Sequence, residues 1–188
     1  DGAVYFCGMR DVMVKLDAAT GSELWKIDFK EREGTGLPSF GYISSPLVVG
    51  DALYVQAGSA VAKLDAKTGR NIWRVLEDKR AMFGNAFSSP VLTTISGEQQ
   101  LIVQNRMTLV GLDPETGKTV WSTPVKAFRG MNILTPTVSG NLIFTASHGG
   151  GAFCFEIVKD DSGAHTVKTV WRDETLEGSM STPVLIGG

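Results

Sequence analysis

Few residues of this sequence combine the types and the spacing that catalysis requires. The sequence contains two histidines: His148, which precedes three glycines, and His165, which lies in a polar turn and is expected at the surface. His148 is the one histidine considered as a general base or metal ligand. The pair Ser44-Ser45 offers hydroxyl groups, but similar pairs recur along the chain and no base accompanies them. Without a second chemical group beside these residues, we predict no catalytic site.

Candidate ligands for a cation or an anion are dispersed over the sequence. Oxygen ligands for a hard cation lie in four predicted loops, at Asp11, Asn85, Asn132 and Glu177. Loop arginines that can bind an anionic group are Arg10, Arg106 and Arg129. Scattered polar side chains of this kind usually contact only solvent, and Cys7 and Cys154 are too far apart for a paired-thiol motif. The sequence therefore predicts no metal site and no resident cofactor.

The composition excludes two classes of partner. The chain has 188 residues, 18 Lys and Arg against 20 Asp and Glu, and a net charge of -2. Nucleic acids and anionic membranes are bound by an excess of basic residues on one face, which this balance does not provide. No apolar run approaches the roughly 20 residues of a transmembrane helix, so we predict no transmembrane segment.

Two motifs repeat along the chain and define its elements. The first runs from Leu16 to Trp25 and recurs at 64–73 and 112–121. A fourth, degenerate copy, in which a longer turn replaces the tight one, ends at Trp171. The second is a proline preceded by Ser or Thr and followed by an apolar run, at Pro46, Pro90, Pro136 and Pro183. Two independent motifs that share a period of about 48 residues indicate a repeat architecture.

Each repeat reads as a four-stranded antiparallel meander. Its apolar runs are short and rich in β-branched and aromatic residues, and Gly, Asn and Asp pairs separate them. Because these runs are apolar on both faces, the sequence predicts radially packed blades of an all-β propeller. The expected blades form a single domain over 1–188 and cover residues 3–28, with 181–186 as a possible first strand, 44–76, 88–123 and 133–172.

The first motif predicts how neighbouring blades dock. Its aspartate can accept bonds from the backbone of its own turn, its glycine can take a left-handed conformation, and its tryptophan can cover the next blade. The predicted docking residues are Asp17, Gly21, Trp25, Asp65, Gly69, Trp73, Asp113, Gly117, Trp121 and Trp171.

The spacing of Asp, Thr-Gly and Trp at 17–25, 65–73 and 113–121 resembles the pyrroloquinoline-quinone (PQQ) type of propeller repeat, which is also similar to the WD40 type. The family includes quinoprotein dehydrogenases, the scaffold lipoprotein of outer-membrane assembly, and exported bacterial proteins. It usually closes seven or eight blades, so the resemblance implies that this chain is a part of such a ring. In the alternative, residues 181–186 complete the first blade and close four blades.

One end of the predicted blades carries the candidate ligand face. The links there share an aromatic residue or leucine followed by glycine, as in Phe40-Gly41, Phe83-Gly84 and Phe128-Arg129-Gly130, and we expect this residue to plug the space under the loop. Side chains that follow it, or that lie in turns of the same end, would line the mouth of the central channel. They are Tyr42, Asn85, Phe87, Arg129, Asn132 and His148.

These features favour a non-catalytic binding or scaffolding module with a protein or glycan partner at these loops. Family resemblance implies a periplasmic or otherwise exported location, and the remaining blades would come from sequence outside this chain. A quinoprotein dehydrogenase is the first alternative. It would use PQQ and Ca²⁺ and would carry adjacent cysteines, which this sequence lacks. A polysaccharide- or peptide-binding propeller is the second, and exposed aromatic residues among Phe40, Tyr42, Phe83, Phe87 and Phe128 would support it.

Overall fold

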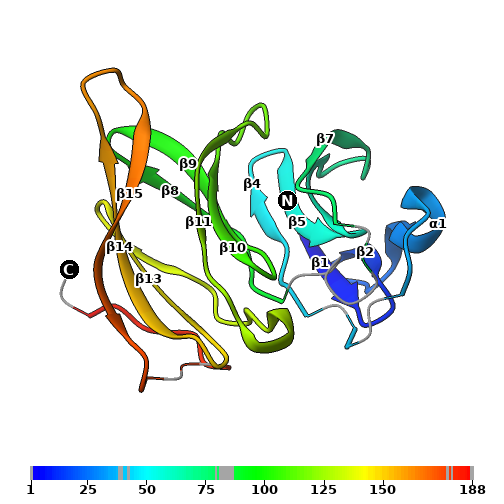
Figure 1. The fold of residues 1–188 in the computed structure, drawn as a ribbon. Coiled ribbons are helices and arrows are strands. Elements are labelled where there is room, and N and C mark those ends of the chain that lie inside the picture. The colour runs from blue at the N-terminus through cyan, green and yellow to red at the C-terminus, as the bar shows by residue number, and fades with distance from the viewer. Residues whose placement is uncertain are drawn as a thin grey trace. The chain divides into compact units, whose positions relative to one another are not determined.

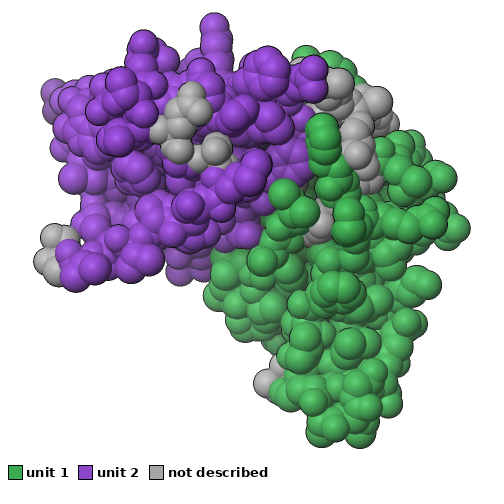
Figure 2. Space-filling view, turned by 90° about the horizontal axis from the view of Figure 1, so that it is seen from below, with its two compact units in different colours: residues 1–86 green, residues 87–188 purple. Residues whose placement is uncertain are grey.

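The computed structural model describes residues 2–37, 40–41, 43–78, 80, 87–176, 178 and 180–186. Nearly all regular structure is antiparallel β-sheet (Figure 1). The chain divides into two compact units, residues 1–86 and 87–188, which Figure 2 shows in different colours. Each unit contains two sheets, and within each sheet the strands are neighbours in sequence order. The predicted antiparallel meanders are therefore confirmed.

The first unit contains a three-stranded and a four-stranded sheet. The first sheet consists of β1 (Ala3–Gly8), β2 (Val12–Asp17) and β3 (Glu23–Asp28), and the short helix α1 (Phe29–Glu33) follows it. The second sheet consists of β4 (Leu47–Val49), β5 (Ala52–Ala57), β6 (Ala60–Asp65) and β7 (Asn71–Val75). Met13, Ile27 and Phe29 pack with Leu53 and Val55 in one apolar core between these sheets.

The second unit contains two four-stranded sheets. The third sheet consists of β8 (Val91–Ile95), β9 (Glu98–Gln104), β10 (Thr108–Leu112) and β11 (Thr119–Pro124). A short 3-10 helix, η1 (Phe128–Gly130), leads to the fourth sheet of β12 (Thr137–Ser139), β13 (Leu142–Ser147), β14 (Gly151–Lys159) and β15 (His165–Asp173). Ile102 and Leu109 of one sheet pack with Ile143 and Phe155 of the other.

The run at 181–186, expected as an additional first strand, forms no strand. A strand requires backbone partners for its N–H and C=O groups. The described residues provide this run with no strand partner, and Val184 and Ile186 are exposed.

In the first three sheets, the turn before the last strand is closed by the aspartate of the first motif. Asp17 Oδ1 accepts the backbone N–H groups of Ala19 at 3.0 Å and Thr20 at 2.8 Å. Gly21, with a φ of 70°, donates its N–H to the Asp17 carbonyl at 2.9 Å. This left-handed conformation favours glycine. The turns that begin at Asp65 and Asp113 have the same geometry, with Gly69 and Gly117 each at a φ of 73°.

A β-bulge follows each of these turns and directs the tryptophan. In every sheet the register shifts beside the residue that pairs with the tryptophan, so that one extra residue, such as Leu24 before Trp25, has no partner. A bulge bends the strand and changes the direction of the next side chain. The residues that pair with the four tryptophans in chain order are Lys15, Lys63, Gly111 and Cys154.

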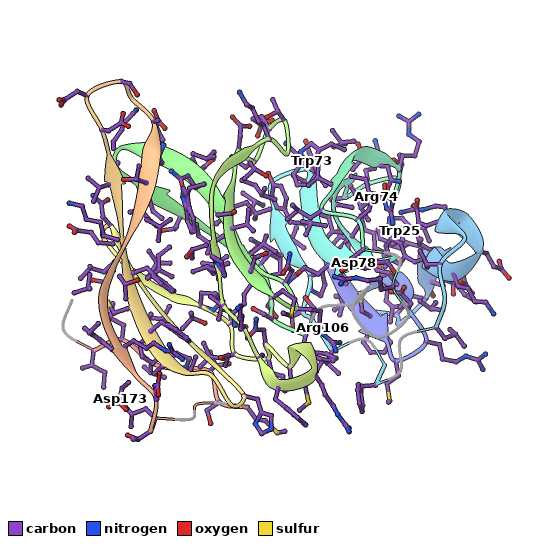
Figure 3. The ribbon with its side chains drawn as sticks, in the orientation of Figure 1. Trp25, Trp73, Arg74, Asp78, Arg106 and Asp173 are labelled. Carbon is purple, nitrogen blue, oxygen red and sulfur yellow. The ribbon has the colours of Figure 1, made fainter. Side chains whose placement is uncertain are left out.

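Trp25, which Figure 3 labels, donates to a backbone carbonyl in the turn after β6 of the second sheet. Its indole N–H donates to the Ala66 carbonyl oxygen at 3.3 Å. Tyr5 Oη and Lys15 Nζ donate to the same oxygen, each at 3.1 Å. Three side chains of the first sheet thus donate to one backbone carbonyl in the turn after β6.

Trp121 is held differently, by apolar packing. It is 4% exposed and lies in the cluster that contains Ile143 and Phe153 of the fourth sheet, while its N–H donates to Gln100 Oε1 at 2.7 Å. A Cβ atom on Gly111 would collide with the indole ring, so glycine is required there. That all four tryptophans dock neighbouring blades remains a prediction.

Replacement of Trp121 by alanine should lower the free energy of unfolding by about 3 to 5 kcal/mol, because it opens a cavity between two sheets. Urea unfolding followed by circular dichroism measures the change. The control is Val170→Ala, which shortens an exposed bulge residue and should change the free energy by less than about 0.5 kcal/mol. Equal losses for the two variants would contradict a docking role for Trp121.

Candidate functional site

The candidate site is the loop over residues 125–136, between β11 and β12. Arg129 and Gly130 both have left-handed backbones, with φ of 53° and 64°, and they turn the chain sharply. The Phe128 N–H donates to the His148 carbonyl at 2.8 Å, and the His148 N–H donates to the Met131 carbonyl at 3.4 Å. The loop is therefore tied to the turn between β13 and β14.

Two buried polar side chains hold this loop from beneath. Asn132 is fully buried, and its Nδ2 donates to the carbonyls of Val125 at 2.7 Å and Asn105 at 3.1 Å. Arg106, labelled in Figure 3, donates from Nη2 to the Arg129 carbonyl at 2.7 Å, and its guanidinium lies 4.4 Å from the centre of the Phe87 ring. Buried hydrogen bonds of this kind fix a loop because their loss leaves polar groups without partners.

The glycines beside His148 allow the two loops to approach closely. Ser147 Oγ donates to the Lys126 carbonyl at 2.9 Å. A Cβ atom on Gly150 would collide with both of these groups, and Gly149 is left-handed with a φ of 70°. The glycine run after His148 therefore has a structural cause.

Above this support the loop exposes an aromatic ring beside a cation. Phe128 is 56% exposed, and the Arg129 guanidinium lies 5.2 Å from its ring centre. The His148 ring meets the Phe128 ring edge-on, with 5.8 Å between their centres. Aromatic residues and arginine contribute most to binding at protein interfaces, so this arrangement has the composition of a binding surface.

The six residues predicted for the ligand face have three different outcomes. Arg129 and His148 lie at this loop and its neighbouring turn. Phe87 and Asn132 are buried beside the loop. The ring of Phe87 packs against Arg106, and Asn132 donates a hydrogen bond to the Val125 carbonyl. Tyr42 and Asn85 lie outside the described residues.

The aromatic residues that were expected to pack under the loops are exposed at the two positions that the structure describes. Phe40 and Phe128 are more than half exposed, whereas Phe87 is buried. Phe83 and Glu177 lie outside the described residues. At the loop over residues 125–136, the buried side chains that contact the loop backbone are those of Arg106 and Asn132, and Phe128 is not among them. The sequence could not indicate this role for Arg106, because its partner is a backbone carbonyl.

Asp11, considered above as a cation ligand, instead joins the two sheets of the first unit. It is buried, and its Oδ2 accepts the Gly58 N–H at 3.0 Å, while Arg74 donates to the Gly58 carbonyl. Burial raises the pKa of the Asp11 carboxyl to about 6, and the nearby Asp28 adds to the rise. The Gly58 N–H and the charge of Arg74 partly oppose this pKa increase.

A surface groove of about 660 Å³ in the first unit is lined by residues of α1 and of the turn at the start of β7 that form hydrogen bonds with each other. Arg32 reaches across it from α1 and donates to the Gly69 carbonyl at 2.9 Å and to Asn71 Oδ1 at 2.8 Å. Asn71 Nδ2 in turn donates to Glu33 Oε1 at 3.0 Å. Because these side chains bind one another, we assign the groove no ligand.

Metal-ligating side chains do not gather in the described part of the chain: no group of three or more His, Cys, Asp or Glu residues there could hold an ion. Cys7 and Cys154 lie in different units, and burial raises the pKa of Cys154. Among the described residues, no helix has the length and apolar character needed to cross a membrane.

The sequence matches a protein family over its whole length. The family model described as the outer membrane protein assembly factor BamB covers residues 1–188. No curated protein matches the sequence.

Solved structures with a similar fold are longer than this chain. BamB from Moraxella catarrhalis has a TM-score of 0.68 at 16% identity, over 95% of this chain and 50% of that one. A quinohemoprotein alcohol dehydrogenase from Pseudomonas putida has a TM-score of 0.61 at 18% identity, over 95% and 33%. Sqt1 from Saccharomyces cerevisiae has a TM-score of 0.60 at 13% identity, over 98% and 48%. The chain thus spans half or less of these proteins, and its propeller fold, predicted from the repeats, is confirmed.

Replacement of Asp11 by asparagine should stabilise the protein at pH 7 but not near pH 4. Between the unfolded pKa of 3.8 and the folded pKa of about 6, the folded state keeps a proton that the unfolded state releases, so stability falls as the pH rises. The asparagine variant lacks this loss, which is at most on the order of 3 kcal/mol. Urea midpoints of both proteins from pH 4 to pH 7 measure the difference.

The control for this pH dependence is Asp17→Asn. Hydrogen bonds from Thr20 lower the pKa of the exposed Asp17 carboxyl, so its contribution is present at neutral pH and is lost as the pH falls. Its variant should therefore be less stable than the parent at pH 7, with a difference that shrinks toward low pH. Parallel curves for Asp11→Asn and the parent would contradict the raised pKa of Asp11.

Proposed function

Because the chain belongs to the family of the outer membrane protein assembly factor BamB, we propose that it is a non-catalytic binding or scaffolding module that contacts a protein partner through the loop over residues 125–136. The observation that carries the proposal is the exposed pair Phe128 and Arg129 on a backbone fixed by buried Arg106 and Asn132. We also propose a periplasmic location, in keeping with the family.

The rigidity of this loop favours binding. Association is opposed by the entropy lost when loops and side chains become ordered at an interface. The backbone of Phe128 and Arg129 is already held by hydrogen bonds to Arg106 and to the turn at His148. The exposed ring can therefore enter a partner's pocket with little further ordering of the loop.

The charge of the loop indicates the chemistry of the partner surface. Residues 125–136 include two cationic side chains, Lys126 and Arg129, and no acidic one. Both are exposed on either side of Phe128. The loop suits a protein surface that offers an apolar pocket beside carboxylates, since Arg binds carboxylates through paired hydrogen bonds.

The alternative of a quinoprotein dehydrogenase rests on a likeness in fold. The residues of this chain do not fit a PQQ site: its cysteines are not adjacent, and Cys7 and Cys154 lie in different units. Trp121 is enclosed by the packing around Gly111 and Phe153, and Gln100 accepts its N–H, so its ring is not open to a quinone.

Replacement of both Phe128 and Arg129 by alanine should weaken binding to the outer-membrane assembly complex of the same organism by at least about tenfold, as expected for central interface residues. Surface plasmon resonance with the purified complex measures the affinity. Both side chains are exposed, so circular dichroism should show an unchanged fold.

The matched control is Leu24→Ala, which removes a similarly exposed apolar side chain from the first unit. It should bind like the parent. Absence of binding by the parent, or equal affinity of both variants, would refute the protein-binding role of this loop. Saturable binding of an oligosaccharide that depends on Phe128 would instead favour the glycan alternative.

Titration of the chain with PQQ and Ca²⁺ should produce no saturable heat up to high micromolar cofactor, because the sequence has no adjacent cysteines and the ring of Trp121 is enclosed. Isothermal calorimetry, together with the absorbance of PQQ, measures this binding. One equivalent of PQQ bound per chain would support the dehydrogenase alternative and refute a purely scaffolding role.

A further inference from the structure

A small pocket opens between the third and fourth sheets, inside the second unit. Its volume is about 280 Å³, and it is lined by Pro124, Lys126, Phe153 and Arg172. Phe153 is buried and belongs to the apolar cluster that joins the two sheets. The pocket therefore combines one apolar wall with two cationic side chains.

Arg172 is held in a fixed position over the apolar wall. It lies opposite Phe153 in the register of β14 and β15, and its guanidinium is 5.1 Å from the centre of the Phe153 ring. Its Nη2 donates to the Gly150 carbonyl at 3.1 Å, in the turn between β13 and β14. Its Nη1 lies 3.2 Å from Glu174 Oε1 in an exposed ion pair. Exposed pairs of this kind are weak, so this nitrogen can exchange its partner.

Lys126 lies against the same turn and has a fixed backbone. Its carbonyl accepts the Ser147 hydroxyl at 2.9 Å, and a Cβ atom on Gly150 would collide with that carbonyl. The preceding residue, Val125, is fully buried. Among the residues that the structure describes, no carboxylate forms an ion pair with the exposed Lys126 side chain. Its charge is therefore open to a ligand in the pocket.

The first unit shows what the repeat places beside the equivalent arginine. Arg74 on β7 and Arg172 on β15 each follow the tryptophan of the first motif, and Arg74 donates to the Gly58 carbonyl in the turn between β5 and β6. Arg74 Nε lies 3.4 Å from Glu33 Oε2, and both side chains are only 13% exposed. Glu33 belongs to α1, in the link that leads to the second sheet. The link that leads to the fourth sheet carries Lys126 and has no acidic residue over 125–136.

We infer that the pocket at Lys126 and Arg172 binds a carboxylate from an acidic side chain of a protein partner, which takes the place that Glu33 takes beside Arg74. Arginine binds a carboxylate through directed hydrogen bonds, and lysine adds a second positive charge. The buried ring of Phe153 keeps water from one side of the pocket, and attraction between charges is stronger where water is excluded. The inference rests on the proposed function for the source of the carboxylate.

Binding of a short acidic peptide tests the pocket directly. The probe is acetyl-Gly-Glu-Gly-amide, which has a single carboxylate, and its control has Gln in place of Glu. In NMR spectra recorded in Hepes buffer, the Glu peptide should shift the amide signals of Gly150 and Gly151 saturably, and the Gln peptide should not. Lys126→Gln and Arg172→Gln should each raise the dissociation constant at least about threefold, as expected for the loss of one partly exposed ion pair. Arg70→Gln makes the same change of charge at an exposed residue of the first unit and should bind like the parent.

Three results of this titration would overturn the inference. They are the absence of saturable shifts, equal binding of the two peptides, and equal affinity of Lys126→Gln and Arg70→Gln. Tighter binding of inorganic phosphate than of the Glu peptide would also overturn it, in favour of a phosphate site.

Charge reversal tests the comparison with Glu33. Lys126→Glu gives the link a carboxylate of its own and should abolish binding of the Glu peptide. Lys168→Glu makes the same change at an exposed residue of β15 outside the pocket and should bind the peptide like the parent. Peptide binding that survives Lys126→Glu would overturn the inference.

The peptide experiment separates this inference from the proposed function, because it needs no partner protein. Binding of the assembly complex through Phe128 and Arg129 without peptide binding would refute only the carboxylate site. Peptide binding that depends on Lys126, without binding of the complex, would support the carboxylate site and refute the protein-binding role of the loop.

Discussion

The sheets of this chain have apolar residues on both faces, and no sheet can bury both faces by itself. Stability therefore requires that each sheet is covered by a neighbour, as in other repeat proteins. The turn at Asp17 and its equivalents serves this requirement, because it sets the register of the last strand. The bulge after the turn then aims a tryptophan away from its own strand. Local hydrogen bonds thus control the packing between sheets.

The same position in the repeat achieves this packing by two different chemistries. In the first unit, Tyr5, Lys15 and Trp25 donate hydrogen bonds to one carbonyl group of the next sheet. In the second unit, Gly111 replaces the lysine, so the ring of Trp121 lies against the strand and joins an apolar core. A polar contact of this kind is directional, whereas apolar packing depends on filling space. The repeat tolerates this exchange because the backbone geometry is unchanged.

The proposed binding function rests on a segment that departs from the repeat. The loop over residues 125–136 contains a left-handed Arg129, and its carbonyls are satisfied by Asn132 and Arg106. Phe128 of this loop is exposed, while the backbone on which it lies is held by these buried bonds. A fixed backbone with an exposed aromatic residue and a cation is the property on which the proposed binding role rests.

The amino-acid sequence by itself determined the repeat, the antiparallel meander and the Asp, Gly and Trp turns, because these features depend on contacts between residues close in the chain. It also predicted that Arg129 and His148 lie at one end of the blades, and the structure brings the loop of Arg129 and the turn of His148 into contact. Only the tertiary structure decided that Phe87 and Asn132 are buried, that Phe128 is exposed, and that Asp11 joins two sheets. These outcomes depend on which distant backbone groups need hydrogen-bond partners, and spacing along the chain does not encode that need.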